Sequence, residues 1–378
     1  MKDIVYLDNS ATTKPCDEAL ACMNKSLTED WGNPSSLHTL GINAEDVLIS
    51  CKEVCAKAIG CRSDEIFFTS GGTEANNLAI FGTVNSRLKR GNRIVTTAFE
   101  HPSVLEAIKS LENKGLEVIY LQPESDGIIS ADKLKNAINK NTVLVSIMLV
   151  NNEIGTIQPV KQAAKAIKDC GAPALLHCDA VQAFGKLPFK VSDLGVDLLS
   201  FSGHKIHAPK GIGVLYRKKG VHIAPVIYGG GQQENVRPGT EPVPLIAALQ
   251  GAVSALPNTA EQYGSIQSLR DYAKEKLTAL GIAEFNSPDG ALPYIINISV
   301  VGFRSETLLH FLDSKGIYVS SGSACAKGGT SHTLTSLGLD VKRIDSALRI
   351  SLSRYSTMSD IDKLCEALYH ATQKLKRV

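Results

Sequence analysis

Short apolar runs and longer amphipathic segments alternate along most of this chain. Runs rich in leucine, isoleucine and valine occupy residues 143–148, 174–176 and 196–201, and polar or glycine-containing sequence bounds each of them. Such runs are typical of strands that are buried on both faces of a parallel sheet. Helical patterns, such as residues 44–59, lie between the runs. The alternation, from about residue 14 to 255, predicts an α/β fold with a mostly parallel sheet covered by helices.

The pattern changes after Pro257. A long helical pattern covers residues 261–280, and three strand-like runs follow it at 294–300, 317–320 and 347–351. This arrangement predicts a second, smaller α+β domain.

An acid and a lysine follow two of the predicted strands. Asp179 comes after the run at 174–176, and Lys205 ends the sequence SGHK after the run at 196–201. Strand ends of α/β sheets are where ligands bind, so both side chains should reach one site. A pyridoxal phosphate (PLP) site needs an acid for the ring nitrogen and a lysine for a Schiff base. We expect His204 and the apolar flank to lower the pKa of the lysine. A solvated turn lysine and a helix-capping aspartate are the simpler alternatives.

Three further segments place polar groups at predicted strand ends. Gly72 and Thr73 precede a helical pattern, where glycines and a helix N-terminus can hold a phosphate; the alternative is a glycine turn with a threonine cap. His101 follows the run at 93–97, and an imidazole there can stack on a cofactor and move protons, although loop histidines are often surface residues. Asn152 follows the run at 143–148, where asparagine commonly forms turns.

Together these segments resemble the NifS/IscS-type cysteine desulfurases, in the class V aminotransferase group of the fold-type I PLP enzymes. Ten motifs carry the resemblance in the family's order and cover essentially the whole chain: YLDNSATT, WGNPSS, SGGTEANN, EHPSV, VNNEIG, CDAVQ, SFSGHKIHAPKGIG, RPGTE, SSGSAC and ALRISLSRY. The resemblance implies a large PLP-binding domain over residues 14–255. It also implies a small domain, made of residues 1–13 and 256–378, that carries a catalytic cysteine loop.

The resemblance assigns roles in binding the cofactor. It implies that Lys205 is the Schiff-base lysine, that Asp179 pairs with the ring nitrogen, and that His101 stacks on the ring. Gln182 would bind the phenolic oxygen of the ring. Thr240 would reach the phosphate from the neighbouring subunit. The other residues implied to hold the cofactor are Gly72, Thr73, Asn152, Ser202 and His204.

The resemblance also implies the reaction. Asn152 and Arg349 would hold the carboxylate of L-cysteine, a role that suits a guanidinium because it binds carboxylates bidentately. Cys325 would take the sulfur as a persulfide and leave L-alanine. The neighbours of Cys325 are small, polar or glycine, which predicts an accessible thiol in a loop, and Lys327 favours its thiolate. The implied function is cysteine desulfurase, and the implied catalytic residues are Lys205, Cys325 and His101.

Partners follow from the same resemblance. Because Thr240 would cross to a second active site, we expect a homodimer with composite sites. The persulfide would pass to an iron–sulfur scaffold protein for iron–sulfur cluster assembly, or to a tRNA-thiolating enzyme. The segment after Cys325 reads a residue or two shorter than in the housekeeping iron–sulfur members, which leaves the acceptor open. Two other function classes also stay open: another PLP-dependent lyase or aminotransferase, such as one acting on selenocysteine, and a non-catalytic scaffold in sulfur transfer.

Composition agrees with a globular enzyme of two or three domains, because 43% of the 378 residues are hydrophobic and 21% are charged. A net charge of +2 argues against direct nucleic-acid binding through bulk charge. We find no apolar run of about 18 residues and no signal-peptide core, so no membrane association is expected. Nine irregularly spaced cysteines indicate thiols in a reducing cytoplasm. Cys51 and Cys55 should lie on a half-buried helix face, and no cysteine set completes a metal site.

Overall fold

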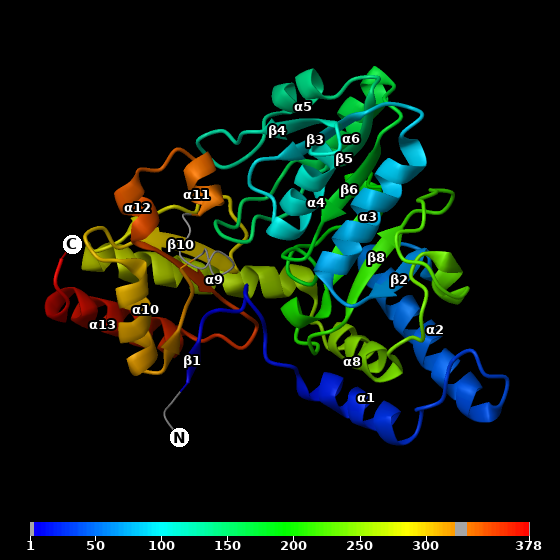
Figure 1. Cartoon of the computed structure of the whole chain (residues 1–378). Coiled ribbons are helices and arrows are strands. Elements are labelled where there is room, and N and C mark those ends of the chain that lie inside the picture. The colour runs from blue at the N-terminus through cyan, green and yellow to red at the C-terminus, as the bar shows by residue number, and fades with distance from the viewer. Residues whose placement is uncertain (1–3, 322–330, 378) are drawn as a thin grey trace.

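A seven-stranded sheet forms the centre of the computed structural model, which describes residues 4–321 and 331–377 (Figure 1). In spatial order the strands are β2 (Ile66–Thr69), β8 (Gly213–Arg217), β7 (Leu198–Ser202), β6 (Leu175–Asp179), β5 (Thr142–Ser146), β3 (Arg93–Thr97) and β4 (Glu117–Leu121). Strand β8 pairs antiparallel with both of its neighbours, and the other pairs are parallel. The expected α/β fold with a mostly parallel sheet is confirmed.

Helices cover both faces of this sheet, because its side chains alternate between two apolar cores. On one face, Phe67, Leu198 and Leu215 pack in a cluster with Leu78 of α3. On the other face, Phe68 and other strand residues join a larger core that includes residues of α2 and α8. The helices of this part are α1 (Asp17–Thr28), α2 (Thr39–Ile59), α3 (Gly72–Arg87), α4 (Pro102–Glu112), α5 (Ala131–Ala137), α6 (Val160–Cys170), α7 (Val191–Leu194) and α8 (Val243–Ser254), with short 3-10 turns at Ser63–Glu65, Gly203–Lys205 and Gln232–Asn235.

A second group of elements lies beside the sheet. An antiparallel sheet has the order β12 (Ala347–Ser351), β10 (Ile295–Ser299), β9 (Glu284–Phe285), and β1 (Val5–Tyr6) pairs parallel with β11 (Ile317–Tyr318). The start of the described chain therefore lies beside its C-terminal third. The helices are α9 (Thr259–Leu280), α10 (Ser305–Ser314), α11 (His332–Ser336), α12 (Val341–Asp345) and α13 (Met358–Lys374).

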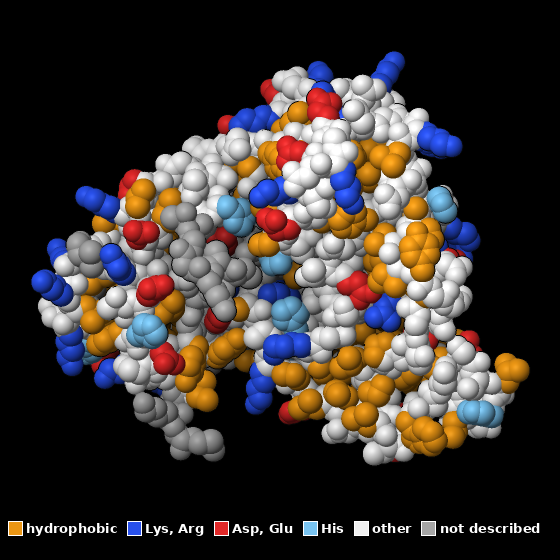
Figure 2. Space-filling model, in the orientation of Figure 1, with side chains coloured by type: hydrophobic (Ala, Val, Ile, Leu, Met, Phe, Trp, Pro, Cys, Tyr) orange, Lys and Arg blue, Asp and Glu red, His pale blue; other side chains and the backbone are white. Residues whose placement is uncertain are grey.

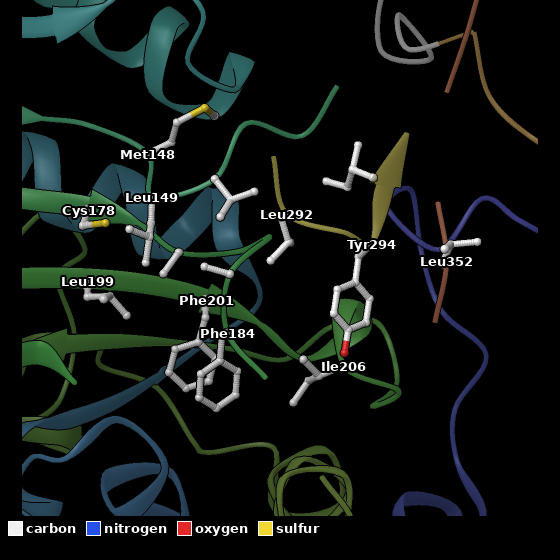
Figure 3. Packing of buried hydrophobic residues seen from close by; sticks show 14 of the residues in the cluster. Met148, Leu149, Cys178, Phe184, Leu199, Phe201, Ile206, Leu292, Tyr294 and Leu352 are labelled. Atoms are coloured by element: carbon white, nitrogen blue, oxygen red, sulfur yellow. The ribbon is translucent and has the colours of Figure 1, made fainter. Parts of the chain in front are cut away.

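One continuous core connects the two groups of elements (Figure 3). Phe184 and Phe201 stack with ring centroids 3.9 Å apart. Tyr294, which immediately precedes β10, belongs to the same core as Ile206. Since Ile206 follows Lys205 directly, this core fixes the backbone on which the lysine is carried.

Several boundaries differ from the sequence predictions. Strand β6 continues through Asp179, so the acid is the last strand residue rather than the first loop residue. Helix α3 begins at Gly72 instead of near residue 75. Cys51 and Cys55 are fully buried rather than half-buried, because α2 packs against both α8 and the sheet. Among the described residues, no helix is both long and apolar enough to cross a membrane.

Candidate active site

The carboxyl ends of β5, β6 and β7 open into a cavity of about 330 Å³. Figure 2 shows a hollow near the centre of the molecule, around which histidine and lysine or arginine side chains gather. Side chains from distant parts of the chain meet in the cavity. The predicted residues that line it are Gly72, Thr73, His101, Asn152, Asp179, Gln182, Ser202, His204, Lys205 and Arg349.

Lys205 lies in the short 3-10 turn that follows β7. Its Nζ donates to the backbone carbonyls of Ser10 and Ala11, at 2.5 and 2.6 Å. These contacts hold the amine against the N-terminal segment, at the cavity wall.

His204 stands beside Lys205 in the same short 3-10 turn. Burial, and then the nearby Lys205 and Lys210, lower the pKa of His204 to about 4. The ring is therefore neutral near pH 7, and its Nδ1 lies 3.1 Å from Thr12 Oγ1. A neutral ring can lower the pKa of the lysine only by excluding water, and the expected effect of His204 on Lys205 stays a prediction.

Lys186 is a second lysine near the site, and the sequence analysis did not identify it. It is only 6% exposed, and its Nζ lies 3.5 Å from Gln182 Oε1. Burial, followed by the charges of Lys205 and Arg349, lowers the pKa of Lys186 to about 7. Gln182 Nε2 donates to the Ser10 carbonyl at 3.0 Å, so the amide of Gln182 is oriented from both ends. Nothing in the sequence GKLP distinguishes this lysine from a surface lysine.

Asp179 is held as a hydrogen-bond acceptor. Asn76 Nδ2 donates to its Oδ2 at 2.8 Å, and the backbone N–H of Val181 donates to its Oδ1 at 2.9 Å. Asn76 Oδ1 is buried and accepts no hydrogen bond from the described residues.

His101 caps the N-terminus of α4. Its Nδ1 accepts from the backbone N–H of Ser103 at 3.2 Å and lies 2.8 Å from Ser103 Oγ. Burial lowers the pKa of His101, and the negative charge of Asp179 partly opposes that change. The neutral ring is therefore favoured at the cavity wall.

The segment between β2 and α3 forms a close-packed backbone turn. Gly71 has φ +157° and ψ −177°, a conformation that glycine adopts readily. A Cβ on Gly72 would lie 2.8 Å from Val181 Cγ2. The first N–H groups of α3 have no acceptor within the helix and lie beside Ser202 and Thr73, so this corner of the cavity can bind an anion.

Arg349 comes from β12 and is 4% exposed. Its Nη1 donates to the Asn152 carbonyl at 3.0 Å, and its Nη2 pairs with Asp8 Oδ1 at 3.1 Å. Burial raises the pKa of Asp8, and Arg349 opposes the rise. Arg349 lines the cavity, so its guanidinium can face a ligand carboxylate there, whereas its Nε is buried without an acceptor among the described residues.

Two buried glutamates and a histidine near the cavity also had no assigned role. Ser331 Oγ donates to Glu153 Oε2 at 2.5 Å, and His332 Nε2 lies 2.9 Å from the Glu100 carbonyl. Burial raises the pKa of Glu100 to about 8, and burial also raises that of Glu153. Glu100 lies in the motif EHPSV and Glu153 lies in VNNEIG. A glutamate is usually exposed, so the residue type gives no sign that these two side chains are buried.

One predicted residue that the structure describes does not line the cavity of this chain. Thr240 is exposed, in a loop whose Arg237 pairs with Glu74 of α3 at 3.0 Å. Cys325, together with Lys327 beside it, lies outside the described residues.

Comparisons with known proteins agree with this geometry. Residues 5–364 match the family model for class-V aminotransferases. Cysteine desulfurase IscS of Methanosarcina thermophila is 40% identical over 378 residues, which is 99% of this chain and 93% of that protein. A solved structure titled NifS-like protein is 38% identical, with a TM-score of 0.93, and the alignment covers 99% of this chain and all of that chain. Another, titled SspA in complex with cysteine, is 35% identical, with a TM-score of 0.83 over 94% of this chain and all of that chain.

Proposed function

Because this chain belongs to the class-V aminotransferase family, we propose that it is a PLP-dependent cysteine desulfurase, which converts L-cysteine to L-alanine and transfers the sulfur. The observation that carries the proposal is the convergence of Lys205 and Asp179 on one cavity, in a chain 40% identical to a cysteine desulfurase along its length. The neighbour crystallised with cysteine supports this substrate class.

The residues around the cavity fit PLP. The Lys205 amine lies at the wall, where it donates to the Ala11 carbonyl, Asp179 accepts from Asn76, and Asn76 Oδ1 is a buried acceptor with no partner among the described residues. Lys205 would bond to the cofactor aldehyde, Asp179 would face its ring nitrogen, and the N-terminus of α3 with Ser202 would hold its phosphate. When bound, PLP supplies an electron sink for negative charge at the substrate Cα.

The chain's own residues would handle the substrate as follows. Arg349 and Asn152, which both line the cavity, would hold the carboxylate of cysteine. Lys205 Nζ, placed at the cavity wall by the carbonyls of Ser10 and Ala11, would remove the proton from the substrate Cα. The Cys325 thiolate would attack the substrate sulfur. The bond between Cβ and sulfur then breaks, a sulfur–sulfur bond forms on Cys325, and Cβ takes up a proton to give alanine.

We propose that two copies of the chain form a dimer with composite sites. Thr240 is exposed instead of lining its own cavity. Large apolar side chains are also exposed around α1 and α2, including Leu27 at 52%, Trp31 at 62% and Leu37 at 96%. Orange side chains gather on this part of the surface at the lower right of Figure 2. Such a patch is typical of an interface, and a second copy would cover it.

The remaining assignments are proposals of the same kind. The chain would divide into a large domain of residues 14–255 and a small domain of residues 1–13 and 256–378, since β1 pairs with β11 in the C-terminal third. An iron–sulfur scaffold protein is the default sulfur acceptor, and a tRNA-thiolating enzyme is the alternative. A cytoplasmic location is proposed from the number and spacing of the cysteines.

Replacement of the sulfur-accepting thiol tests the function. Cys325→Ser should keep the visible absorbance of bound PLP but release almost no alanine or sulfide from cysteine, because no thiolate takes the sulfur. Alanine would be quantified by chromatography, and persulfide would be located by alkylation and peptide mapping after limited cysteine is added.

Cys178→Ser is a matched control, because Cys178 is a fully buried strand residue whose thiol pKa is raised by burial. It should leave persulfide formation on Cys325 intact. Full alanine production by Cys325→Ser would contradict the desulfurase and favour another PLP enzyme. A wild-type protein that binds no PLP would favour a scaffold.

A further inference from the structure

A chain of hydrogen bonds joins the proposed partner of the cofactor nitrogen to the proposed stacking histidine. Asn76 is fully buried, and its Nδ2 lies 2.8 Å from Asp179 Oδ2 and 2.9 Å from Ser103 Oγ. Ser103 Oγ lies 2.8 Å from His101 Nδ1, and the Ser103 backbone N–H donates to the same nitrogen. The roles assigned above to Asp179 and His101 are therefore coupled through Asn76 and Ser103.

The direction of each hydrogen bond is fixed by its donor. A carboxylate oxygen accepts, so the Asn76 atom facing Asp179 must be the amide nitrogen and not the amide oxygen. The nitrogen carries two hydrogens, and the second is donated to Ser103 Oγ. Ser103 then has its own hydroxyl hydrogen to donate to His101 Nδ1.

His101 Nδ1 consequently accepts from two donors of one residue, the hydroxyl and the backbone N–H of Ser103. A backbone N–H is always a donor, so a proton on Nδ1 would face it hydrogen to hydrogen. The proton of the neutral ring is therefore on Nε2, the nitrogen that this chain of hydrogen bonds does not use. Since His101 lines the cavity, Nε2 is the atom that can serve a ligand.

We propose that Asn76 and Ser103 are positioning residues that hold His101 neutral with its proton on Nε2, so that His101 donates a hydrogen bond from Nε2–H to the substrate. This inference deepens the proposed function and rests on it. The base of the reaction is then Lys205, and the Nε2–H of His101 serves as a hydrogen-bond donor without transferring its proton. The chain also ties the His101 ring to Asp179, so one set of contacts orients both groups.

The hydrogen bond from the Ser103 N–H to His101 Nδ1 is also the N-cap of α4, so taking up a proton at Nδ1 would break the cap of that helix. Burial lowers the pKa of His101, which acts in the same direction as the two donors.

The tautomer can be observed directly in the holoenzyme. Protein labelled with ¹⁵N-histidine should give, for His101, one unprotonated Nδ1 and one protonated Nε2 by long-range ¹H–¹⁵N correlation, with the signal assigned by its absence in His101→Gln. In Ser103→Ala, Nδ1 loses one of its two donors, so we expect the pKa of His101 to rise by roughly one unit. We also expect kcat to fall roughly tenfold with a smaller change in KM, because a misplaced hydrogen-bond donor stabilises developing negative charge less well.

Ser103→Thr is the matched control, because it keeps the hydroxyl and the backbone N–H. This variant should have the same His101 tautomer and the same pH profile of kcat as the wild type. Asn76→Ala should change the His101 signals in the same direction as Ser103→Ala. Because Asn76 is fully buried and its variant can fail to fold, Ser103→Ala serves as the independent variant. A wild-type His101 with its proton on Nδ1 would overturn the proposal, as would a Ser103→Ala enzyme with unchanged signals and pH profile. Failure of the desulfurase function is seen separately, as a wild-type protein that makes no alanine.

Discussion

At the residue scale, burial decides which titratable groups around the sheet carry charge. His177 and Lys186 belong to residue types that are often exposed, but His177 is fully buried and Lys186 is 6% exposed. Each has a lowered pKa because the charged form loses its water. Glu100 shows the opposite shift for the same reason, since burial disfavours its carboxylate. The site is therefore built from fewer charges than its composition suggests.

His177 should contribute to acid sensitivity. It lies in β6 between Ser146 Oγ at 2.8 Å and Ser200 Oγ at 3.1 Å, and burial lowers its pKa from 6.5 to about 3. Between these pH values the unfolded chain binds a proton at His177 that the folded chain does not bind. The free energy of unfolding therefore decreases as pH falls through this window. Relative to wild type, His177→Gln should lose less stability between about pH 7 and about pH 4.5.

Urea unfolding followed by circular dichroism at the two pH values would measure this difference. His222→Gln is the control, because His222 is exposed and its replacement should leave the pH dependence as in wild type. An equal loss of stability in wild type and His177→Gln would show that His177 is not the group responsible.

At the element scale, the site depends on where helices and strands begin and end. Strand β6 ends at Asp179, and α3 begins at Gly72. The loop between β2 and α3 is packed so closely that a Cβ on Gly213 would lie 2.6 Å from backbone atoms of Gly71. Gly71 before α3 and Gly213 at the start of β8 therefore allow this close approach. Because Gly213 pairs with Ser202, the N-terminus of α3 lies beside the end of β7.

Gly72→Ala should weaken retention of the cofactor. The added Cβ would lie 2.8 Å from Val181 Cγ2, so the start of α3 must shift away from the phosphate corner. We expect about tenfold faster loss of PLP on dialysis, a size typical of overpacking at a rigid position. The visible absorbance of the dialysed protein would measure it.

Gly264→Ala is a suitable control, because it lies in α9 and its added Cβ would meet no atom within 4 Å. This replacement should raise stability by about 0.5–1 kcal/mol and leave PLP retention unchanged. If both variants kept PLP equally well, the close packing at Gly72 would have no role in cofactor binding.

At the scale of the whole molecule, the cavity is assembled from segments that are far apart in the sequence. The N-terminal residues Ser10 and Ala11 contact Lys205, and Asp8 pairs with Arg349 of β12. These contacts bring an N-terminal segment and strand β12 to the end of the central sheet. Thr240 lies on the surface of this chain, away from its own cavity. The loop that carries it is fixed to α3 by the ion pair between Arg237 and Glu74.

Mixed dimers would test whether Thr240 acts in the partner's site. A Lys205→Ala protomer paired with a Thr240→Val protomer should have one intact composite site, made from Lys205 of one copy and Thr240 of the other. We expect about half of the wild-type activity per dimer, from two parents that are each much less active. Differently tagged protomers, purified as hybrids and weighed by light scattering, would provide the sample. Activity no higher than that of the Thr240→Val parent would place Thr240 in its own chain's site.

The sequence alone determined the fold class and most of the cavity wall. Alternating apolar runs and helical patterns predicted the sheet, and strand β12 lies at the residues expected, 347–351. Polar side chains can leave a buried sheet where its strands end. Lys205, Asp179 and His101 could therefore be identified as candidate site residues from their positions after predicted strands and from their side-chain chemistry. These features are local, because strand period and turn chemistry depend on neighbouring residues.

Only the tertiary structure decided which groups are buried, charged or paired. Lys186 lies in no distinctive motif, and Asn76 and Ser103 stand in SGGTEANN and EHPSV without an assigned role, because the importance of all three comes from atoms contributed by other segments. The same applies to His204, whose pKa is lowered by burial and then by the lysines packed around it. Desolvation and hydrogen-bond direction depend on every element that surrounds a group, so they cannot be obtained from the order of residues along one segment.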